Sequence, residues 1–419
     1  MYFFGRSAII MLTVKTRKEI FMRKQRLARI GAATLAAVLT VQGMGFSSTV
    51  YAKEEPVRVK ADSQTQMSSE PEQVAVKDYG SNSDRTQNFD SDWKFNLGDV
   101  SNAQTPTFDD SKWRTLSLPH DYSIEQEYSQ SLEAESGYLP GGVGWYRKNF
   151  TLGEEAKGKR IRIDFDGVYM NATVYVNGKE VGTHPYGYTP FSFDITDYIS
   201  YDKENTIAVK VDHQTPSSRW YSGSGIYRSV NLTTTNDVHV DLNGIKVESN
   251  NLEKEAGKTV NTDVKTTVVN GSKEAKNITI THTVFKKGEK PDKAIGTFTT
   301  EAKEVKAGEK AEISATVPVE NPKLWSVENP ELYTIRTEVK AGDKLLDTYD
   351  TEYGFRYLNF DTETGFQLNG KNVKLKGVCM HHDQGALGAV ANRRAIERQV
   401  EILQEMGCNS IRVTHNPAS

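Results

Sequence analysis

Short runs in which polar and apolar residues alternate fill most of the chain between residues 89 and 353. Arg160 to Phe165 is one such run, and Ala172 to Val176 is followed by Asn177-Gly178 and a further run from Lys179 to Val181. A period of two is typical of half-buried strands, and Asn-Gly favours a tight type I′ hairpin turn. Many short strands at regular spacing predict β-sandwiches.

The composition of these strands changes near residue 237, which indicates two sandwiches. Residues 237–353 are richer in Lys, Thr and Val, and Ile278 to Val284 and Leu332 to Val339 alternate cleanly. This length and strand spacing fit an immunoglobulin-like sandwich, although the Cys–Trp–Cys hallmark is absent. We therefore predict one β-sandwich over residues 85–236 and an immunoglobulin-like one over residues 237–353.

The last segment, residues 354–419, has a helical period between two strands. Strands are predicted at Val373 to Val378 and at Ser410 to Thr414, and a helix from Asn392 to Met406 with Asn392 as its N-cap. The apolar side chains of this helix share one face: Ile396, Val400, Leu403 and Met406. Strand, helix and strand with short loops predict a βαβ unit with parallel strands, the start of an α/β domain.

The N-terminus has the features of an export signal. A basic run from Met22 to Arg29 precedes a small apolar run from Ile30 to Gly43, and Val50-Tyr-Ala52 resembles a cleavage site. We expect residues 1–52 to be a signal peptide, with Met22 as an alternative start. The apolar run is too short for a comfortable membrane span, so the mature chain is expected to lack one and to be secreted or held at the cell surface. An uncleaved anchor is the alternative.

Composition bears on three further questions: the order of the segment after the signal peptide, nucleic-acid binding and disulfide bonds. Residues 53–84 are rich in Ser, Gln and Glu without apolar periodicity, which predicts a disordered spacer. The net charge of −3 over 419 residues argues against a nucleic-acid partner, since phosphate binding needs a concentrated basic surface. Cys379 and Cys408 are the two cysteines, too few for a disulfide framework, and we expect both to be reduced and buried.

Polar side chains gather at equivalent places in the predicted βαβ unit. His381, His382 and Asp383 follow the first strand, while Arg412 lies in the second strand and His415 at its end. In a (β/α)8 barrel the carboxyl ends of the strands carry the active site, so these residues are expected to converge on one pocket. The alternative is a polar loop with a capping arginine.

A metal site at these residues is not expected. His381 and His382 are adjacent in an extended segment, so their side chains point in opposite directions and would not share one ion. A metal-dependent hydrolase that uses His381 and Asp383 is the weaker alternative.

Aromatic residues cluster in three predicted loops of the first sandwich: Pro119-His-Asp-Tyr122, residues 141–146 and residues 218–228. Aromatic rings beside polar groups can stack on sugars and bind their hydroxyls. The pattern alone favours Trp145 and Trp220 as core side chains. Asp121 and Trp220 are nevertheless retained as candidate sugar contacts, together with Asp383.

These motifs, in this order, resemble those of glycoside hydrolase family 2, and specifically its secreted bacterial β-galactosidases. The motifs are Leu118-Pro-His-Asp-Tyr122, Gly144-Trp-Tyr-Arg147, Phe165-Asp-Gly-Val168, Val176-Asn-Gly178, Ser224-Gly-Ile-Tyr-Arg228, Leu324 to Tyr333, Tyr353-Gly-Phe-Arg356, Leu368-Asn-Gly-Lys371, Gly377 to Asp383 and Asn409 to Pro417. The resemblance runs from about Phe89 to the last residue. It implies a sugar-binding jelly roll, an immunoglobulin-like sandwich and the first part of a TIM barrel.

The resemblance also implies roles for three residues. His381 corresponds to the barrel histidine that contacts galactose, Arg412 to the arginine beside the nucleophile, and His415 to the histidine that meets substrate hydroxyls. The family usually has Asn two residues before that first histidine, where this chain has Cys379. A jelly-roll aspartate that some members place on galactose has no counterpart here, since Ser218-Arg219 precede Trp220.

Family members hydrolyse glycosides with retention of configuration, using two carboxylates about 5 Å apart. The resemblance assigns neither glutamate to a residue of this chain, so no catalytic residue is predicted and the chain alone is expected to be inactive. It implies terminal β-galactosides as the partners, and no cofactor. The alternative function is a non-enzymatic, carbohydrate-binding or adhesive sandwich protein.

Overall fold

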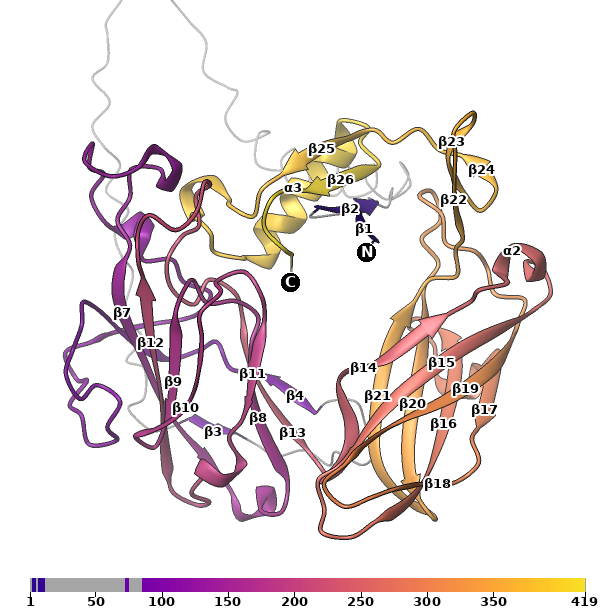
Figure 1. The fold of residues 1–419 in the computed structure, drawn as a ribbon, viewed down its shortest axis with the longest axis horizontal. Coiled ribbons are helices and arrows are strands. Elements are labelled where there is room, and N and C mark those ends of the chain that lie inside the picture. Colours follow the sequence, from indigo (N-terminus) through magenta and orange to yellow (C-terminus); the bar gives the residue numbers. More distant parts are fainter. Residues whose placement is uncertain (1, 5–6, 12–71, 75–84, 419) are drawn as a thin grey trace, which may run out of the picture. The chain divides into compact units, whose positions relative to one another are not determined.

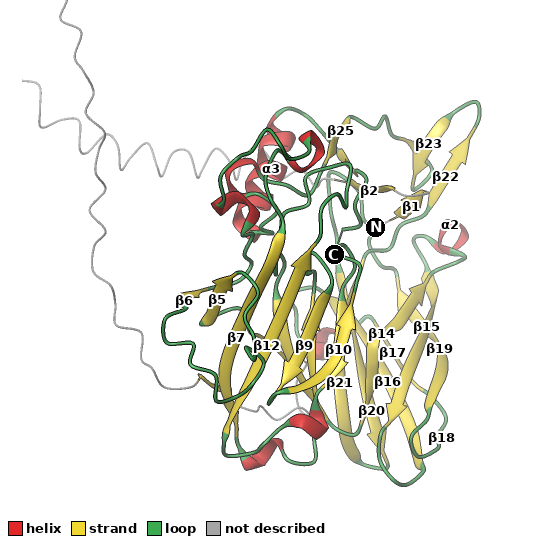
Figure 2. Cartoon of the chain, turned by 60° about the vertical axis from the view of Figure 1, so that its left-hand side comes forward, coloured by secondary structure: helices red, strands yellow, loops and turns green. Residues whose placement is uncertain are grey.

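The structure is a computed structural model that describes residues 2–4, 7–11, 72–74 and 85–418 (Figure 1). Strands dominate these residues and helices are few (Figure 2). Two β-sandwiches are followed by a parallel βαβ unit, which confirms the predicted fold class. None of the helices in this described part is long and apolar enough to cross a membrane.

The first sandwich consists of two sheets. One has the strand order β10-β9-β12-β7-β5-β6, with β3 beside β7, and the other has the order β11-β8-β13-β4. The strands are β3 (Glu72–Val74), β4 (Thr86–Asn88), β5 (Trp93–Leu97), β6 (Arg114–Leu116), β7 (Gly142–Leu152), β8 (Arg160–Phe165), β9 (Ala172–Val176), β10 (Lys179–His184), β11 (Phe191–Asp194), β12 (Glu204–His213) and β13 (Val230–Thr235). Four 3-10 turns interrupt them: Ser123–Glu125, Ala134–Ser136, Glu154–Ala156 and Thr196–Tyr198.

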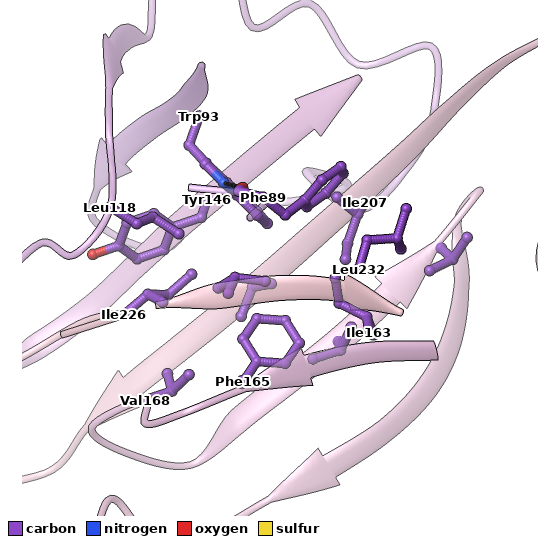
Figure 3. Close-up of a cluster of buried hydrophobic side chains, with 14 of the residues drawn as sticks. Phe89, Trp93, Leu118, Tyr146, Ile163, Phe165, Val168, Ile207, Ile226 and Leu232 are labelled. Atoms are coloured by element: carbon purple, nitrogen blue, oxygen red, sulfur yellow. Dashed lines mark hydrogen bonds between the residues drawn. The ribbon is translucent and has the colours of Figure 1, made fainter. Parts of the chain in front are cut away.

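The predicted alternation fills the space between these sheets. In β8 every second residue is buried, and Ile163 and Phe165 pack with Ile207 of β12 (Figure 3). Burying a side chain of this size contributes about 1.5–3 kcal/mol. The predicted hairpin is also confirmed, because Val176 pairs with Lys179 and both residues of Asn177-Gly178 have the positive φ of a type I′ turn.

The second sandwich has sheets with the strand orders β14-β15-β19 and β17-β16-β20-β21, with β18 beside β16. Its elements are β14 (Val238–Glu248), α2 (Leu252–Glu255), β15 (Thr259–Asn270), β16 (Lys276–Lys286), the 3-10 turn Pro291–Lys293, β17 (Gly296–Thr299), β18 (Lys303–Val305), β19 (Lys310–Glu320), β20 (Tyr333–Ala341) and β21 (Lys344–Tyr353). Apolar residues of both sheets form two buried clusters.

A small antiparallel sheet of three strands leads into the βαβ unit. It consists of β22 (Leu358–Asp361), β23 (Gly365–Leu368) and β24 (Lys371–Asn372). The unit comprises β25 (Gly377–Met380), the 3-10 turn Gly385–Leu387, α3 (Arg393–Glu405) and β26 (Ser410–Val413). β25 and β26 are parallel neighbours, with Gly377 opposite Ser410.

The first strand of this unit was predicted too early in the chain. It begins at Gly377, and residues 373–376 are not in a strand. Asn409 fixes the preceding segment instead: its Oδ1 accepts from the Lys376 N–H at 2.8 Å and its Nδ2 donates to the Lys374 carbonyl at 3.0 Å. The helix is as predicted, with Asn392 Oδ1 accepting from the Ala395 N–H at 3.0 Å.

Parts of the N-terminal predictions fall on described residues. β1 (Tyr2–Phe4) and β2 (Ser7–Met11) form a hairpin inside the predicted signal peptide, and β2 pairs antiparallel with β26. β3 lies inside the predicted spacer 53–84 and pairs with β7, so this part of the spacer is not structureless. The remainder of residues 1–84 lies outside the described residues.

Candidate active site at the barrel strand ends

The parallel pairing of β25 and β26 brings the predicted strand-end residues together. Cys379 lies opposite Arg412 in the register, so His381 follows one strand and His415 follows its neighbour at the same edge. The rings of His381 and His415 are 4.9 Å apart between centroids. The predicted convergence of these two histidines is therefore present in the structure.

Trp220 of the first sandwich completes an aromatic cluster with these histidines. Its indole stacks on His415 with centroids 4.3 Å apart and planes at 9°, and the edge contact with His381 spans 4.8 Å. Its side chain remains 38% exposed, so the expectation that it fills the core is wrong. Trp145 is buried, in a side cluster with Ala103, Trp113 and Ala208.

His415 is held in an unusual conformation at the end of β26. Its φ is 70°, in the left-handed region that residues other than Gly adopt infrequently, with Asn, Asp and His the most frequent among them. Partial desolvation lowers the pKa of its imidazole, and the nearby His381, Arg412 and Arg219 lower it further. The ring is therefore mainly neutral at pH 7, when it can both donate and accept a hydrogen bond.

Arg412 and Cys379 form the adjacent pair. Arg412 Nη1 donates to Cys379 Sγ at 3.7 Å, so the thiol that stands where the family usually has Asn contacts the candidate sugar-binding arginine. Cys379 is exposed and Cys408 half-buried, and neither is in a disulfide, so the expectation of two buried thiols is wrong.

His382 points away from His381, as predicted for adjacent residues. It packs against Tyr188 and Tyr227 of the first sandwich, its Nε2–H donates to the Ser222 carbonyl at 3.3 Å, and its Nδ1 accepts from Asn416 at 3.1 Å. Burial lowers its pKa, which agrees with a neutral ring in this donor–acceptor arrangement. Within residues 85–418, and in the short described strands before them, no three His, Cys, Asp or Glu side chains form a potential metal site.

Asp121 does not face the aromatic cluster. It is 1% exposed, and each of its oxygens accepts two hydrogen bonds from the protein. The donors are Ser123 N and Ser224 N for Oδ1, and Tyr221 Oη and Ala389 N for Oδ2. The expectation of a direct sugar contact is therefore corrected, because no lone pair of this carboxylate is presented to a ligand.

Asp383 is half-buried beside His382. Its negative charge raises the pKa of the Tyr221 phenol, after the larger effects of burial and Asp121. A sugar contact by Asp383 stays a prediction.

Two further contacts join the first sandwich to the βαβ unit, one just after β26 and one just before α3, and the sequence did not predict them. Arg228 Nη2 donates to the Pro417 carbonyl at 2.8 Å, and the Ala391 N–H donates to the Tyr227 carbonyl at 2.9 Å. Both sandwich residues belong to the Gly-Ile-Tyr-Arg motif. The motif was recognisable, but its partners lie far along the chain.

Comparison with known proteins agrees with this architecture. Three family profiles match the chain: "Glycosyl hydrolases family 2, sugar binding domain" over residues 86–236, "Glycosyl hydrolases family 2" over residues 238–356, and "Glycosyl hydrolases family 2, TIM barrel domain" over residues 362–419.

Individual relatives match about four-fifths of the chain. The β-galactosidase BoGH2A of Bacteroides ovatus is 44% identical over 78% of this chain and 38% of its own length, and a β-glucuronidase of Formosa agariphila is 30% identical over 80% and 36%. A family 2 crystal structure from Bacteroides cellulosilyticus has a TM-score of 0.74 at 38% identity, covering 80% of this chain and 43% of that one. The chain thus spans about two-fifths of the length of these relatives. With matches to successive family domains over more than half of its length, the chain belongs to glycosyl hydrolase family 2.

Proposed function

We propose that this chain supplies part of the substrate site of an exported glycosidase that removes terminal β-D-galactose from glycans. The observation that carries the proposal is the cluster of Trp220, His381 and His415 at the ends of two parallel strands. An exposed indole offers an apolar surface to the C–H face of a sugar, and the imidazole nitrogens offer hydrogen bonds to its hydroxyls.

Galactose is favoured over glucuronate by two arguments. The β-galactosidase of Bacteroides ovatus is more similar to this chain, at 44% identity, than two proteins of Formosa agariphila, one named a putative β-glucuronidase at 37% and one a β-glucuronidase at 30%. The axial 4-hydroxyl of galactose also leaves one face of the ring with a continuous C–H surface, which suits an indole. Arg219 and Arg412 are the features that a glucuronide carboxylate would use, so the two sugars must be compared directly.

Saturation-transfer NMR on the full chain makes this comparison. Methyl β-galactoside, methyl β-glucoside and methyl β-glucuronide are presented at equal concentrations. We expect the strongest transfer to the galactoside, through H3, H4 and H5 of the ring that faces the indole. Stronger transfer to the glucuronide would show that the site prefers glucuronides. Equal transfer to all three would show that it has no preference among these sugars.

The chain is proposed to bind galactosides without hydrolysing them. Retaining hydrolysis needs an acid/base and a nucleophilic carboxylate, and the family resemblance assigns neither role to a residue present here. Incubation with a chromogenic β-galactoside should give no release above that of the heat-denatured chain. Sustained turnover would overturn this part of the proposal.

Export is proposed from the basic and apolar runs between Met22 and Gly43 and from the small residues before Lys53. N-terminal sequencing of the protein recovered from the culture medium should begin at Lys53. Recovery only from the cell interior, with residues 22–52 retained, would contradict export.

A further inference from the structure

The buried carboxylate of Asp121 joins a loop of the first sandwich to the loop after β25. Its Oδ1 is held within the sandwich by Ser123 N at 3.0 Å and Ser224 N at 2.8 Å. Its Oδ2 accepts from Tyr221 Oη at 2.5 Å and from Ala389 N at 2.9 Å, and Ala389 belongs to the loop that starts with His381. One carboxylate therefore links two segments that lie far apart in sequence.

Both segments make room for this carboxylate with a glycine in the left-handed region. Gly223 has φ +68°, and a Cβ placed on it would meet Asp121 Oδ2 at 2.6 Å. Gly388 has φ +59°, and a Cβ there would collide with the same oxygen and with Tyr221 Oη. The close approach from both sides requires a residue without a side chain.

Hydrogen bonds carry this link towards the aromatic cluster. Tyr221 follows Trp220 in the chain. Its bond to Asp121 therefore restrains the backbone from which the indole of Trp220 projects. On the barrel side the Gln384 N–H donates to the Gly388 carbonyl at 2.8 Å, which closes the loop between His382 and Ala389. Burial and the charge of Asp121 both raise the pKa of Tyr221, so its phenol stays a donor.

We propose that Asp121 is a positioning residue that aligns Trp220 with His381 and His415 by holding the sandwich loop and the β25 loop on one carboxylate. It acts through Tyr221 and Ala389 and touches no substrate. The inference deepens the proposed function, because it explains how the sugar surface is assembled from two domains.

Asp121→Asn distinguishes the hydrogen bonds of Asp121 within the sandwich from its hydrogen bond to Ala389 in the β25 loop. Neither Ser123 N nor Ser224 N can become an acceptor, so the amide oxygen of Asn must stay on their side. The NH2 group then faces Tyr221, whose hydroxyl can turn to accept, and Ala389 N, which cannot. The substitution therefore keeps the three bonds within the sandwich and breaks the single bond to the barrel loop.

Fluorine NMR of the full chain labelled with 5-fluorotryptophan reports this change. The chain has five tryptophans, Trp93, Trp113, Trp145, Trp220 and Trp325, and Trp220→Phe identifies the signal of interest. His415→Asn gives the unstacked reference, because Asn tolerates the left-handed conformation of that residue. Asp109→Asn is the matched control, since Asp109 accepts from Ser111 N at 3.0 Å in an exposed turn of the same sandwich.

In Asp121→Asn we expect the Trp220 signal to move towards its position in His415→Asn, while the other four signals stay in place. Tyr221→Phe, which removes one donor and leaves the charge, should give a smaller shift in the same direction. A Trp220 signal that stays unmoved in both variants, or a shift of all five signals together, overturns the proposal. If Asp121→Asn does not fold, Tyr221→Phe alone decides between these outcomes.

Galactoside titration gives a second, independent readout. We expect a loss of affinity in Asp121→Asn of about threefold or more, corresponding to a loosened stacking contact, and none in Asp109→Asn. If the unchanged chain binds no galactoside, the proposed function fails, whereas the fluorine signals still test the role of Asp121 without any sugar.

Discussion

The indole of Trp220 and the imidazole of His415 lie face to face, 4.3 Å apart between centroids and 9° from parallel. The first residue belongs to a sandwich loop and the second to the end of a barrel strand. Because His381 meets the edge of the same indole, one tryptophan holds both predicted sugar-binding histidines in place. Part of the candidate site is thus supplied by the first sandwich rather than by the barrel segment.

Replacing Trp220 by Ala is expected to weaken galactoside binding by roughly 3- to 10-fold, since aromatic stacking contributes about 0.5–1.5 kcal/mol. The unfolding free energy should change little, because the side chain is 38% exposed. Isothermal titration and urea unfolding of the full chain measure the two effects. Phe298→Ala is the control, an equally exposed aromatic in the second sandwich, and it should leave binding unchanged. Equal losses in both variants would exclude a specific role for Trp220.

Acidification is expected to destabilise the second sandwich through His282. This side chain is fully buried, and burial lowers its pKa from 6.5 to about 4. The unfolded chain therefore takes up a proton at a higher pH than the folded chain, and stability falls as the pH drops from 6.5 towards 4. Between pH 7.5 and pH 5.0 the loss from this group is about 2 kcal/mol.

Urea unfolding at the two pH values, in the native chain and in His282→Gln, isolates that contribution. The variant should lose about 2 kcal/mol less than the native chain on acidification. The same slope in both proteins would show that the pKa of His282 does not differ between the folded and unfolded states. His213 and His239, whose pKa values burial also lowers to about 4, contribute to the remaining slope.

The ion pair between Arg85 and Asp347 should be costly to break. Arg85 Nη1 lies 2.6 Å from Asp347 Oδ2, and both side chains are at most 5% exposed. Asp347→Ala leaves a buried guanidinium without its carboxylate partner, so we expect a loss of about 3–5 kcal/mol in unfolding free energy. Arg393 and Glu397 form an exposed pair in α3, and Glu397→Ala should cost no more than about 0.5 kcal/mol. Similar losses in the two variants would contradict the role assigned to burial.

The N-cap of α3 is a local test of the βαβ unit. Asn392→Ala removes the acceptor for the Ala395 N–H and should destabilise the helix by about 1 kcal/mol, whereas Asn392→Ser should retain most of the cap. Hydrogen exchange of the α3 amides measures this difference. If the Ser and Ala variants exchange equally fast, the cap contributes nothing.

Local patterns were sufficient to predict the elements whose neighbours are close in sequence. The alternation in β8 and the Asn177-Gly178 turn determine their own conformation, and both are present as expected. The first barrel strand was misplaced because Val373 to Val378 also alternates. A strand needs a partner, and β26 pairs with this segment only from Gly377 onwards. The pairing partner, rather than the alternation, sets where β25 begins.

The candidate site was predictable only in part, for a related reason. His381 and His415 follow two strands whose parallel pairing could be inferred, so their proximity was expected. The stacking of Trp220 on His415 depends on how a sandwich loop meets a strand end, and no local pattern encodes that contact. The role of Asp121 was equally hidden, because three of its four donors are backbone N–H groups, which carry no sequence signature.

The bond from the Arg228 guanidinium to the Pro417 carbonyl limits how these two domains can be exchanged between related proteins. The acceptor is a main-chain carbonyl, which most substitutions of Pro417 would leave in place. The donor is a side chain, which any substitution of Arg228 would alter. A recombination event that brought the sandwich of one relative to the barrel of another would keep this anchor only where the incoming sandwich carries the arginine. A chimera whose incoming sandwich lacks the arginine should lose about 1.5–3 kcal/mol of coupling between the two domains, the usual contribution of a hydrogen bond from a charged donor.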